Sequence, residues 1–584
     1  MKRWGKYIKP YKSSFILGPL CMIIEVIGDI LMPILLALII NKAEEVNEAT
    51  GEMSLTVGWS IGIAFAMIGI VVLMLLGGVG GAYFGSKASV NFATDLRRDL
   101  YEKIQKFSFA NIDKFSTGSL VTRMTNDVTQ VQNFVNMLLR MALRSPGMII
   151  GGIIMAIILR PSLAVILAVT MPLMIIFVFA LMSVSFPRFG ALQKKIDKLN
   201  STVRENVTNV RVVKSFVRED HEKEKFKTAN SELRDGGMRA MKVVIWMGPL
   251  MNIFMYSTVV AVLWFGSGEV LNTGMPLGDL SAFVNYTTQI LSSLMMITML
   301  LMTASRALAS GKRICEVLDE NIDLTDESAA EPDKKVEHGD IEFRNVAFRY
   351  YKNNDEKVID NINIKIKSGS TVGIIGSTGC GKTTLVSMIP RLYDVDEGEV
   401  LVDGTNVKDY SLVNLRDGIG MVLQKNLLFS GTVSENLRWG NMEATDEEIR
   451  AASIHAAADK FLSTFKEGYE TVLDKGGMNL SGGQKQRVCI ARALVKKPKI
   501  LILDDSTSAV DTATERQIQA ALSGEYGDCT KIIIAQRISS VKDAEMIIVM
   551  NDGIITGIGT HDELLQNNEE YSEIFYSQTD RKEA

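Results

Sequence analysis

Histidine and cysteine are scarce in this chain, and charge of one sign is not in excess. Only 4 histidines and 5 cysteines occur among 584 residues. The cysteines are too scattered for a zinc site or a disulfide framework, at Cys21, Cys315, Cys380, Cys489 and Cys529. The 63 Lys and Arg residues nearly balance the 67 Asp and Glu residues, which leaves a formal net charge of −4. This balance argues against a nucleic-acid-binding protein, which is usually strongly basic.

Long apolar runs are abundant, and they crowd into the first 300 residues of a chain with a mean hydropathy of +0.15. The length alone indicates two or more folding units. Helices that cross about 30 Å of hydrocarbon need such runs. They predict a transmembrane domain over 1–320 with six helices, near 14–40, 56–84, 137–159, 162–184, 243–268 and 279–304. The first run is too long for a signal peptide and has no small-residue cleavage site, so we expect no cleavable signal.

The distribution of basic residues predicts the orientation. Lys and Arg precede the first run and fill the connections 85–136 and 185–242, whereas 41–55 carries four glutamates. The positive-inside rule then places both termini and both long connections in the cytoplasm of a cell-membrane protein. Helical periodicity continues through these connections, so we expect the helices to extend beyond the bilayer. The turns between them are expected at Ser108–Phe115 and Val210–Glu222.

Ionisable residues inside the apolar runs are costly and therefore informative. Glu25 and Asp29 lie four residues apart in the first run, on one helix face, and Arg140 and Arg144 repeat that spacing in the third. Two interpretations stay open. The carboxylates contact a cationic or amphipathic cargo in a substrate pathway, or they pair with arginines across the bundle and fix helix registry.

The chain turns polar at 321–339, where no apolar period survives, and we interpret this segment as a linker. Beyond it, short β-type runs alternate with helical stretches, which predicts an α/β nucleotide-binding domain over 340–584. The fold class is therefore a membrane α-helical bundle fused to an α/β P-loop ATPase domain. The expected strands include Ile341–Tyr350, Thr371–Ile375, Ile500–Asp504, Lys531–Ala535 and Met546–Met550.

A phosphate-loop motif, G-x-x-x-x-G-K-[ST], follows the second of these strands. It comprises Gly376, Ser377, Thr378, Gly379, Cys380, Gly381, Lys382 and Thr383, and Thr384 follows it. Its glycines let backbone N–H groups surround phosphates, Lys382 is expected to reach the β- and γ-phosphates, and the Thr383 hydroxyl is expected to bind Mg²⁺. A second apolar strand ends in Asp504 and Asp505, which places an acid beside the metal. The expected ligands are ATP and Mg²⁺.

Between the two motifs stands the string Leu480, Ser481, Gly482, Gly483, Gln484. On these residues the whole chain resembles a half-transporter of the ATP-binding cassette (ABC) exporter family. The resemblance implies ATP-driven export of hydrophobic or amphipathic compounds, including drugs, by two such chains. It implies that Tyr350 stacks on adenine, that Gln424 senses Mg²⁺ and that Asp511 ends a loop communicating across the dimer. Ser481, Gly482, Gly483 and Gln484 would be cofactor-binding, with Ser481 and Gly483 on the γ-phosphate of a nucleotide held by the opposite domain.

Two positions depart from the family pattern. Asp505 stands where the family has a glutamate that polarises the attacking water, and Gln536 stands where it has a histidine that contacts the γ-phosphate. A misplacement of about 1 Å can cost roughly 10²-fold in rate, and glutamine cannot become cationic. We therefore hypothesise a heterodimer. This chain supplies a degenerate site, and a non-identical partner brings the intact glutamate and histidine.

Three alternatives remain on the sequence alone. They are a homodimer that hydrolyses ATP slowly, a lipid flippase, and an ATP-gated channel or regulatory subunit. A long regulatory insertion would favour the last, and none separates residue 304 from the nucleotide-binding domain. Membrane lipid and a small-molecule cargo are the other expected partners, and no nucleic acid is expected.

Overall fold

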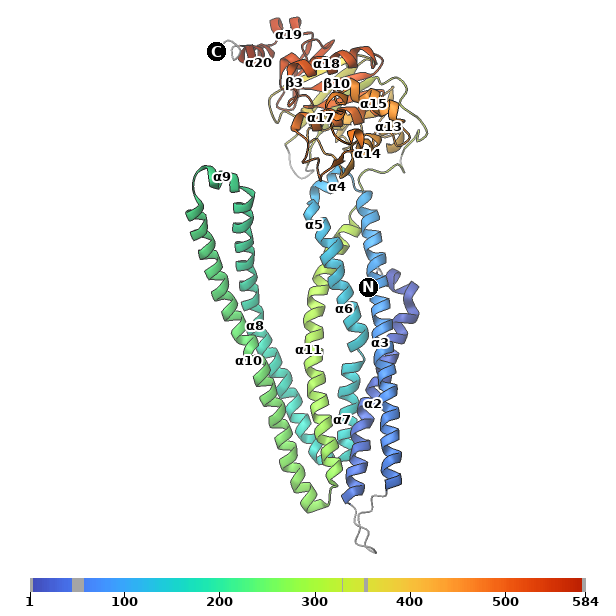
Figure 1. Cartoon of the computed structure of the whole chain (residues 1–584), viewed down its shortest axis with the longest axis vertical. Coiled ribbons are helices and arrows are strands. Elements are labelled where there is room, and N and C mark those ends of the chain that lie inside the picture. The colour runs from blue at the N-terminus through green and yellow to red at the C-terminus, as the bar shows by residue number, and fades with distance from the viewer. Residues whose placement is uncertain (1–3, 45–56, 328, 351–355, 580–584) are drawn as a thin grey trace. The chain divides into compact units, whose positions relative to one another are not determined.

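The computed structural model describes residues 4–44, 57–327, 329–350 and 356–579 (Figure 1). Contacts between Cα atoms divide the chain into two compact units. The first unit comprises Met1–Gln105 and Gly118–Asp319, and the second comprises Lys106–Thr117 and Glu320–Ala584. The short segment Lys106–Thr117 thus packs with the second unit, whereas the sequence analysis included it in the transmembrane domain over 1–320. Residue 56, the expected start of the second run, lies outside the described residues.

The described residues of the first unit form helices and short connections, and six helical stretches are long and apolar enough to cross a membrane. They run from 41 to 55 residues, against the roughly 20 that a bilayer needs. The expected six spans and their long extensions are therefore confirmed. The elements are α1 (Trp4–Ile8), η1 (Lys9–Tyr11), α2 (Lys12–Glu44), α3 (Val57–Gln105), α5 (Thr117–Thr122), η2 (Arg123–Asp127), α6 (Val128–Met141), α7 (Arg144–Leu159), α8 (Pro161–Thr208), α9 (Val210–Ser215), α10 (Glu219–Thr273) and α11 (Leu277–Asp319).

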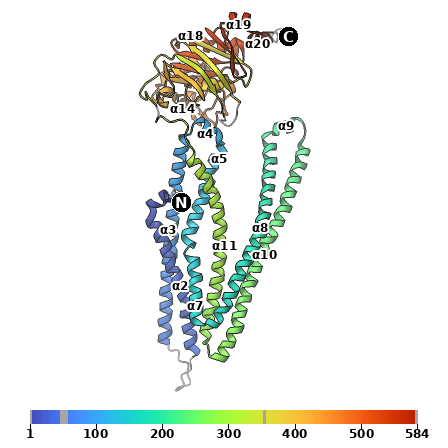
Figure 2. The ribbon, with the colours of Figure 1, turned by 180° about the vertical axis from the view of Figure 1, so that it is seen from behind.

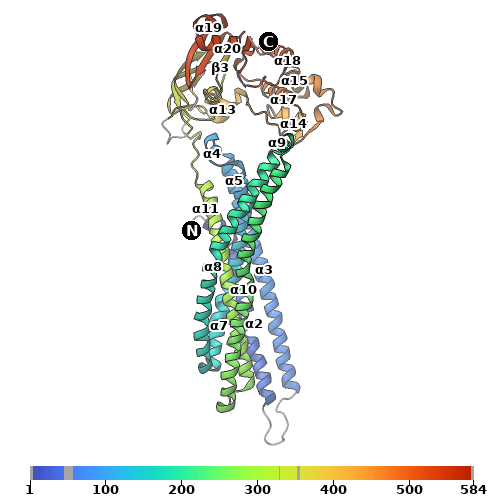
Figure 3. The ribbon, with the colours of Figure 1, turned by 90° about the vertical axis from the view of Figure 1, so that its left-hand side faces the viewer.

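Helices α8 and α10 form an antiparallel pair joined by α9 within the first unit (Figures 1 and 2). Figure 3 shows α9 at the tip of this pair. Near the opposite end, α8 and α10 pack on α7 and α11 through a buried cluster that includes Leu167, Val262 and Phe283. Toward α9 the ribbons of the pair diverge from α11 (Figures 1 and 2). The segment around α9 is one of the two turns that the sequence predicted.

Close packing of α2 on α3 depends on small residues. A Cβ atom at Gly77 would lie 2.8 Å from the carbonyl oxygen of Cys21. A Cβ atom at Gly81 would lie 2.4 Å from the sulfur of Met22. Without a hydrophobic driving force between helices in lipid, such backbone approach supplies the van der Waals contact that holds them together.

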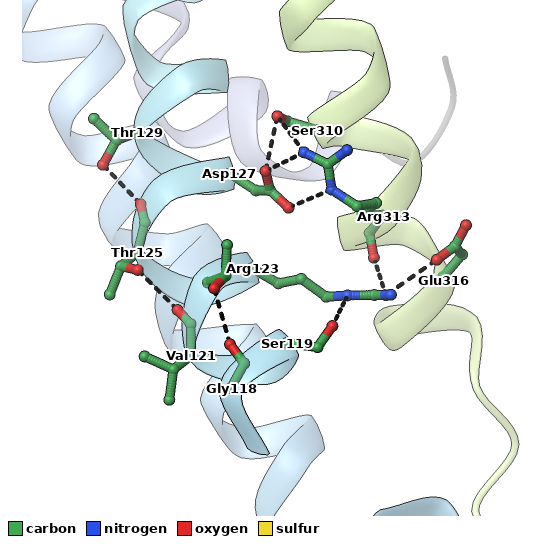
Figure 4. A network of polar contacts seen from close by, with 11 residues as sticks. Gly118, Ser119, Val121, Arg123, Thr125, Asp127, Thr129, Ser310, Arg313 and Glu316 are labelled. Atoms are coloured by element: carbon green, nitrogen blue, oxygen red, sulfur yellow. Dashed lines mark hydrogen bonds and ion pairs between the residues drawn. The ribbon is translucent and has the colours of Figure 1, made fainter. Parts of the chain in front are cut away.

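A charged network joins α11 to the π-helical turn η2 (Figure 4). The carboxylate of Asp127 accepts hydrogen bonds from Nε of Arg313 at 2.8 Å and from Oγ of Ser310 at 2.9 Å. On the next turn, Nη1 of Arg123 lies 3.1 Å from Glu316 and donates to the carbonyl oxygen of Arg313 at 2.6 Å. Because the Asp127 side chain is only 4% exposed, removing Arg313 would leave a buried charge unpaired.

The second unit contains α4 (Phe109–Lys114) and an α/β domain. A mainly parallel six-stranded sheet has the order β12-β11-β3-β10-β9-β6, and a four-stranded antiparallel sheet has the order β2-β1-β4-β5. The strands are β1 (Ile341–Phe348), β2 (Ile359–Ile366), β3 (Thr371–Gly376), β4 (Glu397–Val402), β5 (Thr405–Asn406), β6 (Ile419–Val422), β7 (Gly431–Thr432), β8 (Val472–Leu473), β9 (Ile500–Asp504), β10 (Thr530–Ile534), β11 (Met546–Asn551) and β12 (Ile554–Gly559).

The helices of the second unit follow the strands. They are α12 (Lys382–Ser387), α13 (Leu412–Asp417), α14 (Val433–Arg438), α15 (Asp446–His455), α16 (Asp459–Leu462), η3 (Gly468–Glu470), α17 (Gly482–Val495), α18 (Thr512–Gly524), η4 (Ile538–Ser540), α19 (His561–Asn567) and α20 (Glu569–Thr579). The expected strand Ile500–Asp504 matches β9, and the other four differ at their ends by one or two residues. β1 stops at Phe348, so Tyr350 lies just beyond the strand.

The parallel strands β3, β9 and β10 are buried along almost their whole length, as apolar strands covered on both faces should be. Their carboxyl ends meet at one edge of the sheet. The phosphate loop follows β3, Asp505 follows β9 and Gln536 lies two residues beyond β10. The topology therefore brings the phosphate loop, Asp505 and Gln536 to the edge where open α/β sheets bind ligands, although the first and last of these are more than 100 residues apart in sequence.

Two contacts fasten the ends of the predicted linker. The carboxylate of Asp403 accepts backbone N–H bonds from the four residues at 337–340, at 2.7, 3.1, 2.7 and 3.0 Å. The side chain of Asn111 on α4 donates to the carbonyl oxygen of Asn321 at 2.9 Å. Ser108 caps α4, so the turn that the sequence placed at Ser108–Phe115 is a short capped helix.

Candidate functional site

The phosphate loop has a backbone that only glycine can follow at key points. Gly376 has φ +153°, and a Cβ atom there would lie 2.1 Å from the carbonyl oxygen of Met550. Gly381 has φ +95° and precedes α12. The Nζ of Lys382 donates to the carbonyl oxygens of Gly376 at 2.8 Å and Ser377 at 2.7 Å, so it lies across the loop. The exposed residues Ser377, Thr378 and Gly379 form the open rim.

The predicted metal-binding residues meet beside this loop. The Thr383 hydroxyl donates to the Asp504 carboxylate, at 2.9 Å to one oxygen and 3.1 Å to the other. Asp504 is 1% exposed, and its burial raises the pKa of that carboxyl. Hydroxyl and carboxylate oxygens suit Mg²⁺, which also takes phosphate oxygens as ligands. In the described part of the chain no group of three or more His, Cys, Asp or Glu could hold a metal alone, so phosphate would complete this site.

The two residues that depart from the family pattern contact each other. The Nε2 of Gln536 donates to Oδ2 of Asp505 at 2.9 Å. Burial raises the pKa of Asp505, although side-chain hydrogen bonds from Gln424 and Gln536 and the charge of Lys382 oppose this shift. Gln424 therefore lies beside Asp505 in the same cluster, and its expected role in sensing Mg²⁺ stays a prediction. Asp505 has φ +47°, and its backbone N–H donates to the carbonyl oxygen of Ile534 at 3.0 Å.

The string from Ser481 to Gln484 begins helix α17. Ser481 is its N-cap, with its hydroxyl accepting from the Gln484 N–H while the Gln484 side chain accepts from the Ser481 N–H at 2.9 Å. A Cβ atom at Gly483 would lie 2.7 Å from the carbonyl oxygen of Ala509, whereas one at Gly482 would lie 3.8 Å from the nearest atom. The first N–H groups of a helix have no partner within the helix, so its N-terminus favours an anion.

Gln486 is a site residue that the sequence analysis missed. Its Nε2 lies 3.3 Å from Oγ of Ser508, and its Oε1 accepts from the Ala509 N–H at 3.1 Å. It therefore ties α17 to the loop that follows Asp505. Its position two residues after the glycine-rich string, on the buried face of the helix, was the available signal. At the end of that loop, Asp511 caps α18 by accepting from the Thr514 N–H at 3.0 Å.

Tyr350 lies beside the phosphate-binding helix. Its hydroxyl is 2.8 Å from Oγ1 of Thr384, and the residue remains 41% exposed. Its ring packs against Phe348 and Tyr393, with centroid distances of 5.0 and 5.3 Å. Cys380 is 2% exposed, with its sulfur 3.6 Å from Nζ of Lys382, which fits a small residue packed inside the loop. No local sequence pattern relates Tyr393 to Tyr350, which lies 43 positions earlier in the chain.

The membrane carboxylates lie in the first unit and contact one arginine. Nη2 of Arg144, at the start of α7, is 2.9 Å from Oε1 of Glu25 and 3.4 Å from Oδ2 of Asp29. The other oxygen of Glu25 is buried and has no hydrogen-bond partner among the described residues. This geometry matches the pairing interpretation, with one guanidinium in contact with both carboxyl groups.

Family models match both units. The ABC transporter transmembrane region matches residues 15–294, and the ABC transporter model matches residues 359–508. An ABC transporter ATP-binding protein of Bacillus subtilis strain 168, YfiB, is 37% identical over 582 residues, covering 100% of this chain and 99% of the relative. Rv1273c of Mycobacterium tuberculosis, also named an ABC transporter ATP-binding protein, is 35% identical over 98% of this chain and 97% of its own length.

Two further relatives extend the comparison. YgaD of Bacillus subtilis is 33% identical over 98% of both chains, and its name assigns it provisionally to multidrug export as an ATP-binding/permease protein. A solved structure of a bacterial Atm1-family ABC exporter with ATP bound aligns with a TM-score of 0.77 over 98% of both chains, at 23% identity, and shows the fold.

These matches cover the six-helix unit and the nucleotide-binding unit in one polypeptide. The chain is a multi-pass membrane protein with an ATP-binding domain, and proteins built in this way work as dimers that couple ATP hydrolysis to transport. The chain therefore belongs to the ABC transporter family, with the transmembrane region and the ATP-binding domain in one polypeptide.

Proposed function

We propose that this chain is the subunit of a heterodimeric ABC exporter that supplies the degenerate ATP site. The observation that supports this is the direct hydrogen bond between Asp505 and Gln536, at 2.9 Å. Asp505 stands where the family has its general base, and Gln536 stands where it has the histidine that contacts the γ-phosphate. In this chain the two side chains bond to each other. A carboxylate already accepting amide hydrogen bonds is one methylene short of a glutamate and is poorly placed to orient water.

On this proposal the chain keeps all the groups that are expected to bind ATP and Mg²⁺. Lys382 and the loop amides would hold the β- and γ-phosphates, and Thr383, Asp504 and Gln424 would hold Mg²⁺, which neutralises phosphate charge when bound. Tyr350 would stack on adenine with its exposed face. The second site of the dimer would pair Ser481, Gly482, Gly483 and Gln484 of this chain with the phosphate loop, glutamate and histidine of the partner.

The transport cycle follows from linkage between these sites. Two ATP molecules favour the closed pair of nucleotide-binding domains, and α4 and α9 would pass that closure to the membrane helices. Hydrolysis at the partner's intact site resets the cycle, while ATP at this chain's site stays bound through several turnovers. By the positive-inside rule, both termini and the second unit lie in the cytoplasm.

The proposed cargo is a hydrophobic or amphipathic compound of the multidrug type. The provisional naming of YgaD supports this class. Glu25 and Asp29 share one arginine, and two carboxyl groups beside a single guanidinium favour cargo that is cationic.

The test is ATP turnover by the purified full-length chain in lipid nanodiscs, alone and with a candidate partner that has the intact glutamate and histidine. We expect ATP binding without appreciable hydrolysis by the chain alone, and cargo-stimulated hydrolysis by the pair. Brisk turnover by the chain alone would instead establish a homodimeric exporter.

A further inference from the structure

Tyr393 contacts two parts of the second unit that the sequence does not connect. Its ring packs on Tyr350 with centroids 5.3 Å apart and planes at 87°, and on Phe348 with centroids 5.4 Å apart. Tyr350 and Phe348 also pack edge to face, at 5.0 Å. The three rings form one cluster, and Tyr350 is the member that we propose stacks on adenine.

The other contacts of Tyr393 are with α4. Its hydroxyl donates to Oδ2 of Asp113 at 2.8 Å, and its ring lies 6.0 Å from that of Phe109. Burial and the nearby Asp113 carboxylate raise the pKa of Tyr393, so the hydroxyl keeps its proton at neutral pH and remains a donor. One side chain therefore contacts both the adenine platform and the helix that joins two membrane-spanning helices.

A cavity adjoins this ring cluster. A cavity of about 870 Å³ is lined by Tyr350 and Tyr393 and, on the α4 side, by Ser108, Asn111 and Asp113. Elsewhere α4 is held by the bond from Asn111 to Asn321 and by ion pairing of Lys114 with Glu320 at 2.8 Å. Ring positions are thus not imposed by close packing on every side, and a ligand on Tyr350 has room to change them.

We propose that Tyr393 is a positioning residue that transmits adenine binding at Tyr350 to α4. This rests on the proposed role of Tyr350 in the ATP site. Adenine stacked on the exposed face of Tyr350 fixes that ring, the edge contact then fixes Tyr393, and the hydroxyl of Tyr393 fixes Asp113. Linkage is reciprocal. If adenine binding favours the ordered state of α4 by a given factor, then ordering of α4 raises the affinity for adenine by the same factor. The proposed signal depends on the base. The hydroxyl of Tyr350 also lies 2.8 Å from Oγ1 of Thr384 in the phosphate-binding helix, so a ligand without a base is the necessary comparison.

Hydrogen exchange of the full-length chain in lipid nanodiscs tests this proposal, with MgATP compared against Mg-tripolyphosphate, which has no base. Both ligands should protect amides of the phosphate loop at 376–384. Only MgATP should also slow exchange at 106–117, by about fivefold or more, the lower end of typical coupling. Absence of protection at 376–384 would contradict the proposed ATP site itself, which separates that failure from failure of the transmission.

Two variants remove the hydrogen bond to α4. Tyr393→Phe removes the donor hydroxyl, and Asp113→Ala removes the acceptor, whereas an asparagine would still accept through its amide oxygen. Each should keep MgATP protection at 376–384 and lose most of it at 106–117. The matched control is Tyr410→Phe, which removes a buried hydroxyl bonded to the Val402 carbonyl oxygen at 2.9 Å in the same unit. It should keep both effects. Unchanged protection at 106–117 in Tyr393→Phe or Asp113→Ala, or equal protection by tripolyphosphate in the parent chain, would overturn the proposal.

Discussion

Restoring the family residues at the two departing positions should convert this chain into an active ATPase. The change is the double variant Asp505→Glu with Gln536→His, made in the full-length chain. The side chain at 505 gains one methylene, which corrects a displacement of about 1 Å and is worth roughly 10²-fold in rate. A protonated histidine at 536 replaces a neutral donor by a charged one, and such a bond is about twice as strong. A further factor of about ten is expected, since 1.36 kcal/mol is tenfold.

The assay is single-turnover hydrolysis of radiolabelled ATP by the purified chain in nanodiscs, with no partner present. Because the phosphate loop and the Ser481–Gln484 string are intact, a dimer of the double variant has two complete sites. Asp505→Glu alone should give most of the gain. Addition of Lys382→Ala should abolish it, because Nζ of Lys382 lies at the phosphate loop, 2.8 Å from the Gly376 carbonyl oxygen. A double variant that binds ATP as the parent does but hydrolyses it no faster would refute the reasoning from the two positions.

Three further outcomes are expected from single substitutions. Gly483→Ala places a Cβ atom 2.7 Å from a backbone oxygen and should lower the ATPase rate of the heterodimer at least about tenfold. In the control Gly482→Ala the nearest atom is 3.8 Å from the new Cβ, so the rate should change little. Equal losses in the two variants would contradict the role of Gly483. Asp29→Asn should reduce efflux of monocationic dyes more than of neutral ones in a whole-cell dye assay, and equal efflux of both would leave the carboxylate with helix registry alone. Asp403→Asn should lower the thermal unfolding midpoint of the purified chain at neutral pH, because backbone N–H bonds lower the pKa of that carboxyl. The ionised Asp403 contributes its full stability above the unfolded pKa of about 3.9, and this contribution is lost as pH falls through the lower folded pKa. The unfolding midpoints of the parent and the variant should therefore converge in acid. A difference that does not change with pH would contradict the assignment.

Much of this architecture follows from local sequence. The six apolar runs predict six helices because hydrocarbon leaves backbone polar groups no partner outside a helix. The phosphate loop and strand β9 were placed to within a residue because glycine spacing and apolar strand composition are local signals. The short capped helix at Ser108–Phe115 was expected as a turn, but its capping by Ser108 and Asn111 became visible only in three dimensions.

Residues far apart in sequence could not be joined by such signals. Nothing local relates Gln486 to Ser508, or Tyr393 to Asp113, which are 280 positions apart and bonded at 2.8 Å. Arg144 could be suspected as a partner of Glu25 and Asp29 from charge alone. Only the packing of α2 against α7 decided that one guanidinium serves both carboxylates.

The sequence by itself determined the chemistry of this protein, because the residue types at 376–384, 481–484, 505 and 536 decide which groups can donate, accept or carry charge. The tertiary structure alone decided which of these groups meet. It placed Asp505 against Gln536, and α4 against the ring cluster of Tyr350. Those contacts arise where parallel strands end together and helices pack across the domain, and such contacts depend on the whole fold.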